Sequence, residues 1–297
     1  MKDGKPYVIG IGELLWDVLP DGKKMGGAPA NFIYHINHMG IYGDIISSVG
    51  NDPDGMELIK LIKQKGIPTD LIDIDSRYPT GTVTVKIDRS GNPEYTIHEN
   101  IAWDHIHFVK SIEENLRMAD AICFGSLAQR NTVSAETIIE CLRGVDKDCL
   151  RVFDINLRQK FFTPKTIMES LYMADILKIN EDEIIVVAEM FDSGKDEMSI
   201  LKNISEKFNL RLIALTKGTD SSILYSEDEI SSLKTPEVSV VDTVGAGDSF
   251  TAVLVAGLLK GDTLKSIHQK AVDVSAWVCT LPGATPPYTQ QIKDILR

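Results

Sequence analysis

The chain has 297 residues, of which 43% are hydrophobic and 25% charged, the composition of a soluble globular protein with ample core to bury. Its formal net charge is −12 and it contains no run rich in lysine or arginine, so nucleic acid and anionic membranes are poor candidate partners. Its first residues are polar and no apolar stretch reaches membrane-spanning length, so we expect no signal peptide and a cytoplasmic protein whose cysteines are free thiols.

The N-terminal segment predicts a strand followed by a ligand-facing loop and a helix. Residues 7–12 form a short β-rich run that ends in glycine. Asp17 follows, where open α/β sheets place their ligands, although a solvated loop acid is the alternative. Gly27 lies among small residues at a helix start, where a ligand can approach the backbone closely. Asn31 in the first turn offers an amide donor and an acceptor, and Gly40 ends this helix.

A change of hydrophobic period to two indicates a β-hairpin within this alternation of strands and helices. Its predicted strands are residues 82–87 and 94–98, joined by a turn at 89–92. The alternate residues are polar or charged, which suggests a small sheet with one exposed face, the shape of a lid. We predict one domain, residues 1–297, with lid segments at about 13–25 and 77–107.

Strands and helices alternate again from residue 120 onwards. This order favours an α/β fold with a mostly parallel sheet covered by helices on both faces. In such a sheet the carboxyl ends of the strands share one edge, so polar residues that follow them gather there. The segments that follow predicted strands contain Asp17, Asn156, Arg158, Asn180, Glu183, Thr216, Gly218 and the stretch from Gly245 to Asp248.

The stretch from Val241 to Phe250 has the strongest local pattern in the chain. Residues 238–241 predict the end of a strand, and the apolar residues after Asp248 recur at helical spacing. Gly245, Ala246 and Gly247 at the junction would leave backbone N–H groups free for an anion. Asp248 in the first turn suits either a helix cap or a group that meets a substrate hydroxyl beside a bound phosphate.

Two stretches carry a family resemblance: residues 26–31 with Met39-Gly40 after them, and residues 242–250. Together they resemble the two signatures of the ribokinase (PfkB) family of carbohydrate kinases, across essentially the whole chain. Residues 12–17 and 154–158 look most like those of fructokinases. The Walker pattern is absent and no GxGxxG follows the first strand, which disfavours a P-loop ATPase or a dehydrogenase.

The resemblance implies a ribokinase-like fold and an ATP-dependent sugar kinase, with fructose to fructose 6-phosphate as the first candidate reaction. Asp248 would be the general base, beside an anion hole formed by Gly245, Ala246 and Gly247. The residues implied for substrate binding are Asp17, Gly27, Asn31 and Arg158. Those implied for the nucleotide are Asn180, Glu183, Thr216 and Gly218. Glu183 would hold Mg²⁺ through water, and a K⁺ site would involve Asp242, Val244 and Gly283.

Several alternatives stay open at this point. Hydroxyl-binding residues do not identify a sugar, so a 2-keto-3-deoxygluconate, ribose or nucleoside kinase fits as well. A non-catalytic sugar or nucleotide sensor would predict a damaged base or anion hole, whereas Asp248 and its glycines are intact. We expect a small-molecule sugar and ATP as partners, no nucleic acid or membrane, and a homodimer formed through the lid.

Overall fold

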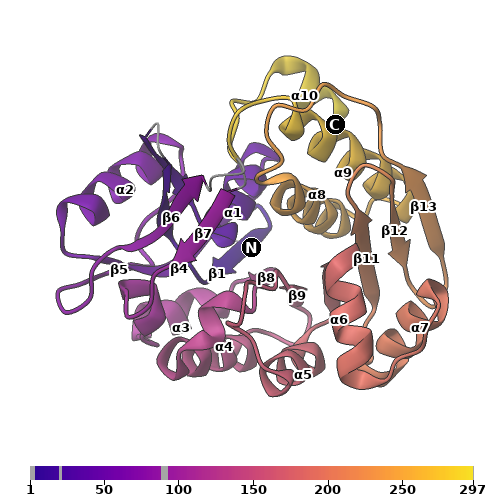
Figure 1. The fold of residues 1–297 in the computed structure, drawn as a ribbon, viewed down its shortest axis with the longest axis horizontal. Coiled ribbons are helices and arrows are strands. Elements are labelled where there is room, and N and C mark those ends of the chain that lie inside the picture. The colour runs from indigo at the N-terminus through magenta and orange to yellow at the C-terminus, as the bar shows by residue number, and fades with distance from the viewer. Residues whose placement is uncertain (1–3, 20–21, 88–92, 297) are drawn as a thin grey trace.

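The computed structural model describes residues 4–19, 22–87 and 93–296, and within them the chain forms two sheets (Figure 1). The strands of the larger sheet are β1 (Tyr7–Ile11), β4 (Tyr42–Gly50), β5 (Ile72–Asp75), β8 (Ala121–Phe124), β9 (Leu150–Asp154), β10 (Ile176–Asn180), β11 (Leu212–Lys217), β12 (Ser221–Tyr225) and β13 (Ile230–Lys234). Their order is β13-β12-β11-β10-β9-β8-β1-β4-β5. Pairing is parallel from β5 to β11 and antiparallel at β12 and β13.

Helices cover both faces of this sheet (Figure 1), as the alternating sequence pattern predicts. One face carries α3 (Lys110–Leu116), α4 (Thr132–Gly144), α5 (Pro164–Met173), α6 (Glu181–Phe191) and α7 (Glu197–Phe208). The other carries α1 (Ala28–His38), α2 (Pro53–Gln64), α8 (Ala246–Lys260), α9 (Leu264–Cys279) and α10 (Gln290–Ile295). Successive strand side chains therefore enter opposite cores: Ile9 lies in the first and Val8 in the second. The predicted α/β fold is confirmed.

The second sheet, which we call the small sheet, has the order β3-β2-β6-β7. Its strands are β2 (Leu15–Leu19), β3 (Gly22–Gly26), β6 (Gly81–Ile87) and β7 (Pro93–Ile97). The predicted hairpin is present as β6 and β7, while its turn at 89–92 lies outside the described residues. Leu15, Val83 and Ile97 are buried in the core, whereas Tyr95 is 52% exposed. Strand alternation puts Tyr95 on the same face as Ile97, so this face packs on the body at Ile97 and is accessible at Tyr95.

Hydrogen bonds from the start of β6 and from β2 join the small sheet to the N-terminal part of α2. We call this end of the sheet its root. The Asp52 carboxylate accepts the Gly55 N–H at 2.7 Å, which caps α2. It also accepts the Thr80 N–H at 2.8 Å, one residue before β6 begins. The Trp16 indole N–H of β2 donates to the Asp54 carbonyl at 3.0 Å. Hydrogen bonds at this edge therefore help to fix the position of the small sheet relative to the body.

The prediction that residues 238–241 end a strand is wrong. This segment lies in no strand, and Val240 and Val241 are 53% and 62% exposed. The Val241 N–H instead donates to the Cys279 carbonyl at the end of α9, at 2.8 Å. The strand that precedes this loop is β13, which is mostly polar and exposed because it lies at the edge of the sheet. Its sequence therefore lacks the apolar signal by which buried strands are recognised.

None of the helices in the described parts of the chain combines the length and apolarity that a membrane crossing requires. The four cysteines are free thiols, as predicted. Three of them, Cys123, Cys141 and Cys149, are buried in the cores, and Cys279 is partly buried.

Candidate active site

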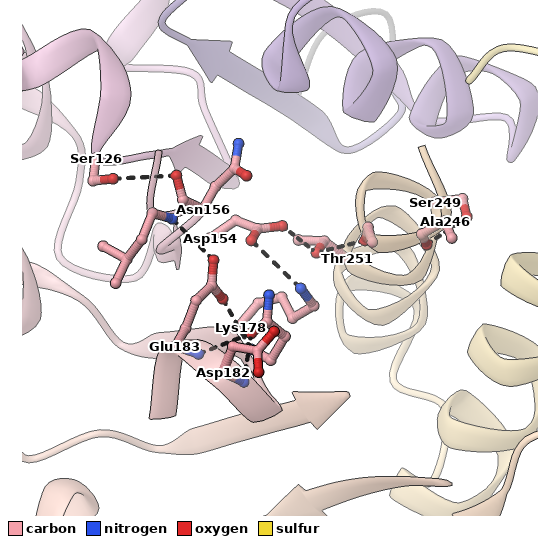
Figure 2. Close-up of polar contacts among 12 residues, drawn as sticks. Ser126, Asp154, Asn156, Lys178, Asp182, Glu183, Ala246, Ser249 and Thr251 are labelled. Atoms are coloured by element: carbon pink, nitrogen blue, oxygen red, sulfur yellow. Dashed lines mark hydrogen bonds and ion pairs between the residues drawn. The ribbon is translucent and has the colours of Figure 1, made fainter. Parts of the chain in front are cut away.

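The carboxyl ends of the central parallel strands meet the N-terminus of α8 (Figure 2). Asp154 ends β9 and Asn180 ends β10, and Asn180 lies in register with Thr216 near the end of β11. Because these strands are parallel, their ends share one edge, as the sequence predicts. Most of the residues singled out from the sequence lie at this edge or on the segments that pack against it.

The N-terminus of α8 is built to receive an anion. Gly245 has φ 82° and precedes the first turn, and a β-carbon added to it would lie 2.5 Å from the Ala284 side chain. Only glycine fits such a position. No side chain caps this helix among the residues described. The first N–H groups of a helix have no intrahelical acceptor and lie at the positive end of its dipole, so phosphate oxygens fit this cradle.

Asp248 lies in the first turn of α8, as predicted, but its carboxylate contacts α1 instead of capping α8. Its Oδ2 accepts a hydrogen bond from Asn31 Nδ2 at 2.8 Å, across 217 positions of sequence. Burial and the neighbouring Asp154 raise the pKa of Asp248 to about 7, while Asn31, Lys178 and Arg158 act in the opposite direction. A carboxylate with a pKa near the working pH is suited to accept a proton from a bound group.

Asn31 has an unused acceptor beside this carboxylate. Its side chain is 4% exposed, and its Oδ1 has no hydrogen-bond partner in the part of the chain that the structure describes. A buried amide oxygen without a donor costs about 1–3 kcal/mol. A hydroxyl group of a bound ligand would supply that donor, so Asn31 fits the substrate role predicted for it.

Asp17 lies on the small sheet, on β2, opposite Lys24 of β3. A β-carbon at Gly26 would lie 2.4 Å from its Oδ2, so glycine there leaves room for the carboxylate. Burial raises the pKa of Asp17 to about 6, against the opposing effects of Arg158 and Lys24. Asp17 is therefore an acid that is partly withdrawn from water without being enclosed.

Glu13, which the sequence analysis gave no role, fixes the start of α1. It is buried, and its Oε1 accepts the Ala28 N–H at 3.3 Å. Gly27 has φ 113°, and a β-carbon there would lie 2.3 Å from the Glu13 carbonyl oxygen. Burial is the main influence on Glu13 and raises the pKa of its carboxyl. The predicted close approach at Gly27 is therefore made by the chain itself.

Arg158 lies in the loop after β9 and is exposed. Among the described residues it forms no ion pair, yet its positive charge is close enough to lower the pKa values of Asp17 and Asp248. The next residue, Gln159, donates from Nε2 to the Tyr95 carbonyl of the small sheet at 2.8 Å. The loop thus bridges the body and the small sheet, and it leaves the guanidinium available to an anionic group.

Asn180 and Glu183 form a capping box at the start of α6. Asn180 Oδ1 accepts the Glu183 N–H and Glu183 Oε2 accepts the Asn180 N–H, each at 2.9 Å. Glu183 Oε1 accepts the Leu157 N–H, also at 2.9 Å. Both carboxylate oxygens are thus held by backbone donors at the ends of two strands. A metal ion would meet Glu183 through water more readily than directly.

Asp242, Val244 and Gly283 lie together, as predicted. Asp242 Oδ1 accepts the Val244 N–H at 3.1 Å, and its Oδ2 accepts the Gly283 N–H at 2.9 Å. These contacts join the start of the α8 loop to the loop after α9. The described residues contain no group of three or more His, Cys, Asp or Glu side chains arranged to hold a metal ion. A cation here would therefore depend on backbone carbonyls and water in addition to Asp242.

Gly218 and Thr216 lie further along the strand ends, toward β12. Gly218 has φ 45°, and its carbonyl accepts the Thr235 hydroxyl at 3.0 Å. The exposed valines of the loop that follows include Val240 and Val241. This side of the site therefore presents backbone and apolar groups, with the Glu181 carboxylate close to Gly218.

Three further residues lie beneath the cradle and were not predicted from the sequence: Asp154, Lys178 and Thr251 (Figure 2). The Thr251 hydroxyl donates to Asp154 Oδ2 at 2.7 Å, and Lys178 Nζ lies 3.6 Å from Asp154 Oδ1. The available signal was a lysine inside an otherwise apolar strand, because lysine is almost never buried without a partner.

Comparison with known proteins gives a consistent result. The family model described as "pfkB family carbohydrate kinase" matches residues 18–291. An uncharacterized sugar kinase of Pyrococcus horikoshii is 28% identical over 270 residues, covering 85% of this chain and 83% of the relative. Its crystal structure matches with a TM-score of 0.84, over 98% of this chain and 100% of that one.

Two further relatives carry more specific names. A fructokinase of Salmonella typhimurium is 25% identical, over 84% of this chain and 83% of its own length. An ATP-dependent 6-phosphofructokinase of Thermoanaerobacterium thermosaccharolyticum is 28% identical, over 95% of this chain and 91% of its own length. Relatives at similar identity therefore act on different sugars.

Proposed function

The chain belongs to the pfkB family of carbohydrate kinases, and from that premise we propose that it transfers the γ-phosphoryl group of ATP to a hydroxymethyl group of a sugar. The observation that carries this proposal is the contact between Asn31 and Asp248 at the N-terminus of α8. It places a hydroxyl-binding amide, a carboxylate of raised pKa and a phosphate cradle in one place.

Asp248 acts as the general base in this proposal. A sugar hydroxyl is too weak an acid to ionise at neutral pH, so a carboxylate must accept its proton as the oxygen attacks. The hydroxyl oxygen forms a bond to the γ-phosphorus, and the bond from that phosphorus to the β–γ bridging oxygen breaks. The bridging oxygen leaves with the electron pair as part of ADP, and the proton goes to Asp248.

Gly245, Ala246 and Gly247 stabilise the charge on the transferred phosphoryl group. Phosphoryl transfer needs positioning and charge stabilisation more than covalent chemistry, and preorganised N–H donors provide both. The positive φ of Gly245 and its contact with Ala284 fix the cradle before any ligand binds.

The nucleotide lies along the edge from Asn180 to Gly218, next to the exposed valines before α8. Two observations support this placement of the nucleotide. Asn180 and Thr216 are paired across β10 and β11, and the loop beside them exposes Val240 and Val241. A structure of the Pyrococcus horikoshii relative is titled as a complex with ATP. Mg²⁺ bound with ATP would reduce the charge of its phosphates. Glu183 contributes by holding the strand ends in place, and through water to the ion.

A monovalent cation, of which K⁺ is the first candidate, would bind beside Asp242, Val244 and Gly283. The two hydrogen bonds of Asp242 bring these loops together next to the cradle. Each oxygen of a carboxylate keeps a further lone pair when it accepts one N–H. A cation bound there would stabilise the Asp242 carboxylate, and with it the loop that presents Gly245.

Fructose is the first candidate acceptor, with Asp17, Asn31 and the backbone at Gly27 binding its hydroxyl groups. Support comes from the fructokinase relatives and from the unfilled acceptor of Asn31. The exposed guanidinium of Arg158 favours a second class, sugars that carry a carboxylate or phosphate. The 6-phosphofructokinase relative and a 2-keto-3-deoxygluconate kinase activity fall within that second class.

The small sheet acts as a lid and as the contact between two copies of the chain. Water must be excluded from the phosphate, because it competes with the sugar hydroxyl. Val18, 36% exposed and on the face opposite to the buried Val83 and Ile97, is an apolar group on this sheet that a second copy would cover. Light scattering should give the mass of a dimer, and a monomeric mass at working concentrations would overturn this part of the proposal.

The function is tested by ADP release across a panel of fructose, ribose, 2-keto-3-deoxygluconate, fructose 6-phosphate and nucleosides. We expect one sugar to be phosphorylated, and Asp248→Asn to lose about 10²–10⁴ in kcat while still binding that sugar and ATP. Near-normal kcat in this variant would contradict the role of Asp248. Absence of turnover with every acceptor would favour the sensor alternative.

A further inference from the structure

Lys178 is a buried lysine that the proposed mechanism leaves unexplained. It lies in β10 and is 5% exposed. Burial disfavours its ammonium form, but Asp154, Glu183 and Asp248 outweigh that effect, and the pKa of Lys178 stays raised above its usual value. Lysine therefore remains charged inside the protein, where an isolated ammonium ion would be costly.

The ammonium group lies directly beside the phosphate cradle. A β-carbon added to Gly247 would lie 3.4 Å from Lys178 Nζ, so the ammonium adjoins the second glycine of the α8 N-terminus. On its other side, Asp154 Oδ1 lies 3.6 Å away. The Thr251 hydroxyl, one turn along α8, is within hydrogen-bond distance of Asp154 Oδ2 and of the Gly247 carbonyl, at 2.7 and 3.0 Å.

We propose that Lys178 is a positioning residue for phosphoryl transfer: paired with Asp154 beneath the α8 N-terminus, it adds a fixed positive charge to the anion hole and favours the ionised form of Asp248. This inference rests on the proposed function. Lys178 acts through Gly247 and Asp248 and needs no contact with the substrate.

The arrangement of charges around Asp248 explains why such a residue is needed. Asp154 at the end of β9 raises its proton affinity, while Lys178 from β10 and Arg158 from the loop after β9 lower it. Asn31 reaches it from α1, and the Cys123 thiol lies nearby on β8. Without Lys178, two partly buried carboxylates would lie close together, and the only positive charge left to compensate Asp248 would be that of Arg158, an exposed side chain.

If the Lys178–Asp154 pair were purely structural, removing it would leave the pKa of the Asp248 carboxyl unchanged. The titration of Asp248 therefore tests the proposal. The side-chain carboxyl of Asp248 is titrated by ¹³C NMR in the ligand-free protein and assigned by its loss in Asp248→Asn. We expect Lys178→Met to raise its apparent pKa by about one unit, and Asp154→Asn to lower it. Lys178→Arg should stay near the wild type because the charge is kept, and the Asp154→Asn/Lys178→Met double variant should fall between the single ones.

The pH profile of kcat/KM supplies the second readout. The acid limb should move to higher pH in Lys178→Met, with turnover at pH 7 reduced about tenfold or more. The matched control is Lys270→Met, which removes a lysine paired at 3.0 Å with Asp262, away from the site. It should leave both the titration and the profile unchanged.

The inference is overturned if Asp248 titrates alike in the wild type and Lys178→Met, whatever happens to the melting temperature. Should Lys178→Met fail to fold, the Asp154→Asn variant decides: an unchanged or raised titration of Asp248 contradicts the proposal. If the wild type phosphorylates no acceptor, the proposed function fails, but the NMR titration still tests the coupling between Lys178 and Asp248.

Discussion

Asp248 and Asp17, the two acids proposed to meet the sugar, lie in regions of very different construction. Asp248 lies in the first turn of a 15-residue helix packed in the core, accepts a hydrogen bond from Asn31, and has Asp154 and Lys178 beneath it. Asp17 lies in a five-residue strand of the small sheet and accepts no hydrogen bond from the described residues. The difference indicates that the chemistry of the body is preorganised, whereas Asp17 obtains its partners when a ligand arrives.

Damage to the cradle should have a large effect on turnover and test the preorganisation of the body. Gly245→Ala places a methyl group 2.5 Å from the Ala284 side chain, at φ 82°. We expect the α8 N-terminus to shift and kcat to fall by about 10²–10³. Gly261→Ala is the control, because this C-cap of the same helix has φ 75° but open space around it. Equal losses in both variants would attribute the effect to backbone strain alone.

As the pH is lowered, kcat/KM should respond to Asp248 in the body before it responds to Asp17 in the small sheet. Because the pKa of Asp248 is raised to about 7, protonation removes the base as the pH falls below that value. We expect kcat/KM to fall about tenfold per pH unit below 7. It should fall more steeply below about 6, where Asp17 also protonates. An acid limb near pH 4 would show that Asp248 titrates like an ordinary carboxyl.

The same shift has a consequence for stability that needs no substrate. The folded pKa of Asp248 lies above its unfolded value, so the stability that its proton contributes is present at low pH and lost as the pH rises through 7. Asp248→Asn should therefore raise the melting temperature at pH 8, by about 2 °C or more, and change it little near pH 4.

The control for the melting-temperature measurement is Asp242→Asn, which replaces an acid six positions before Asp248. The Asp242 carboxylate accepts two backbone N–H groups in an accessible loop. An amide has a single acceptor oxygen, so this variant should lose one of those bonds and gain no stability at pH 8. A gain in Asp242→Asn equal to that in Asp248→Asn would mean that net charge, and not the burial of Asp248, is the cause.

The smallest effect should come from the root of the small sheet. Asp52→Ala removes the cap of α2 and the bond to Thr80. We expect a loss of about 1 kcal/mol in unfolding free energy, measured by denaturant titration, with kcat within a few-fold of the wild type. Asp52→Asn keeps an acceptor and should lose less. A large fall in kcat would instead show that lid placement limits turnover.

The sequence predicted the body better than the periphery, for a physical reason. Strands β1, β8 and β10 are buried on both faces and therefore form apolar runs, and glycine at Gly245 and Gly40 marks helix ends that need positive φ. The edge strand β13 carries mostly polar, exposed side chains, so its sequence contains no apolar pattern from which a strand could be predicted. The valines at 238–241 suggested a strand although they lie in an exposed loop.

Within the site, motifs located residues but gave no partners. Asp248 and Asn31 stand out by their glycine-rich surroundings, whereas their mutual hydrogen bond depends on how α1 and α8 pack. The pairing of Lys178 with Asp154 and Thr251 depends on strand register and helix rotation, which spacing in one sequence does not reveal. The resemblance implies that Glu183 holds Mg²⁺ through water, but it does not reveal that both carboxylate oxygens accept backbone N–H groups.

The most direct measurement is a side-by-side kinetic comparison of Asp248→Asn and Asp17→Asn with the sugar that the panel identifies. The account predicts that Asp248→Asn loses kcat by about 10²–10⁴ with little change in KM. Asp17→Asn should raise KM about tenfold or more, the loss of a charged hydrogen bond, with kcat nearly unchanged. The reverse pattern, with turnover surviving in Asp248→Asn and kcat lost in Asp17→Asn, would contradict the assignment of the chemistry to the body.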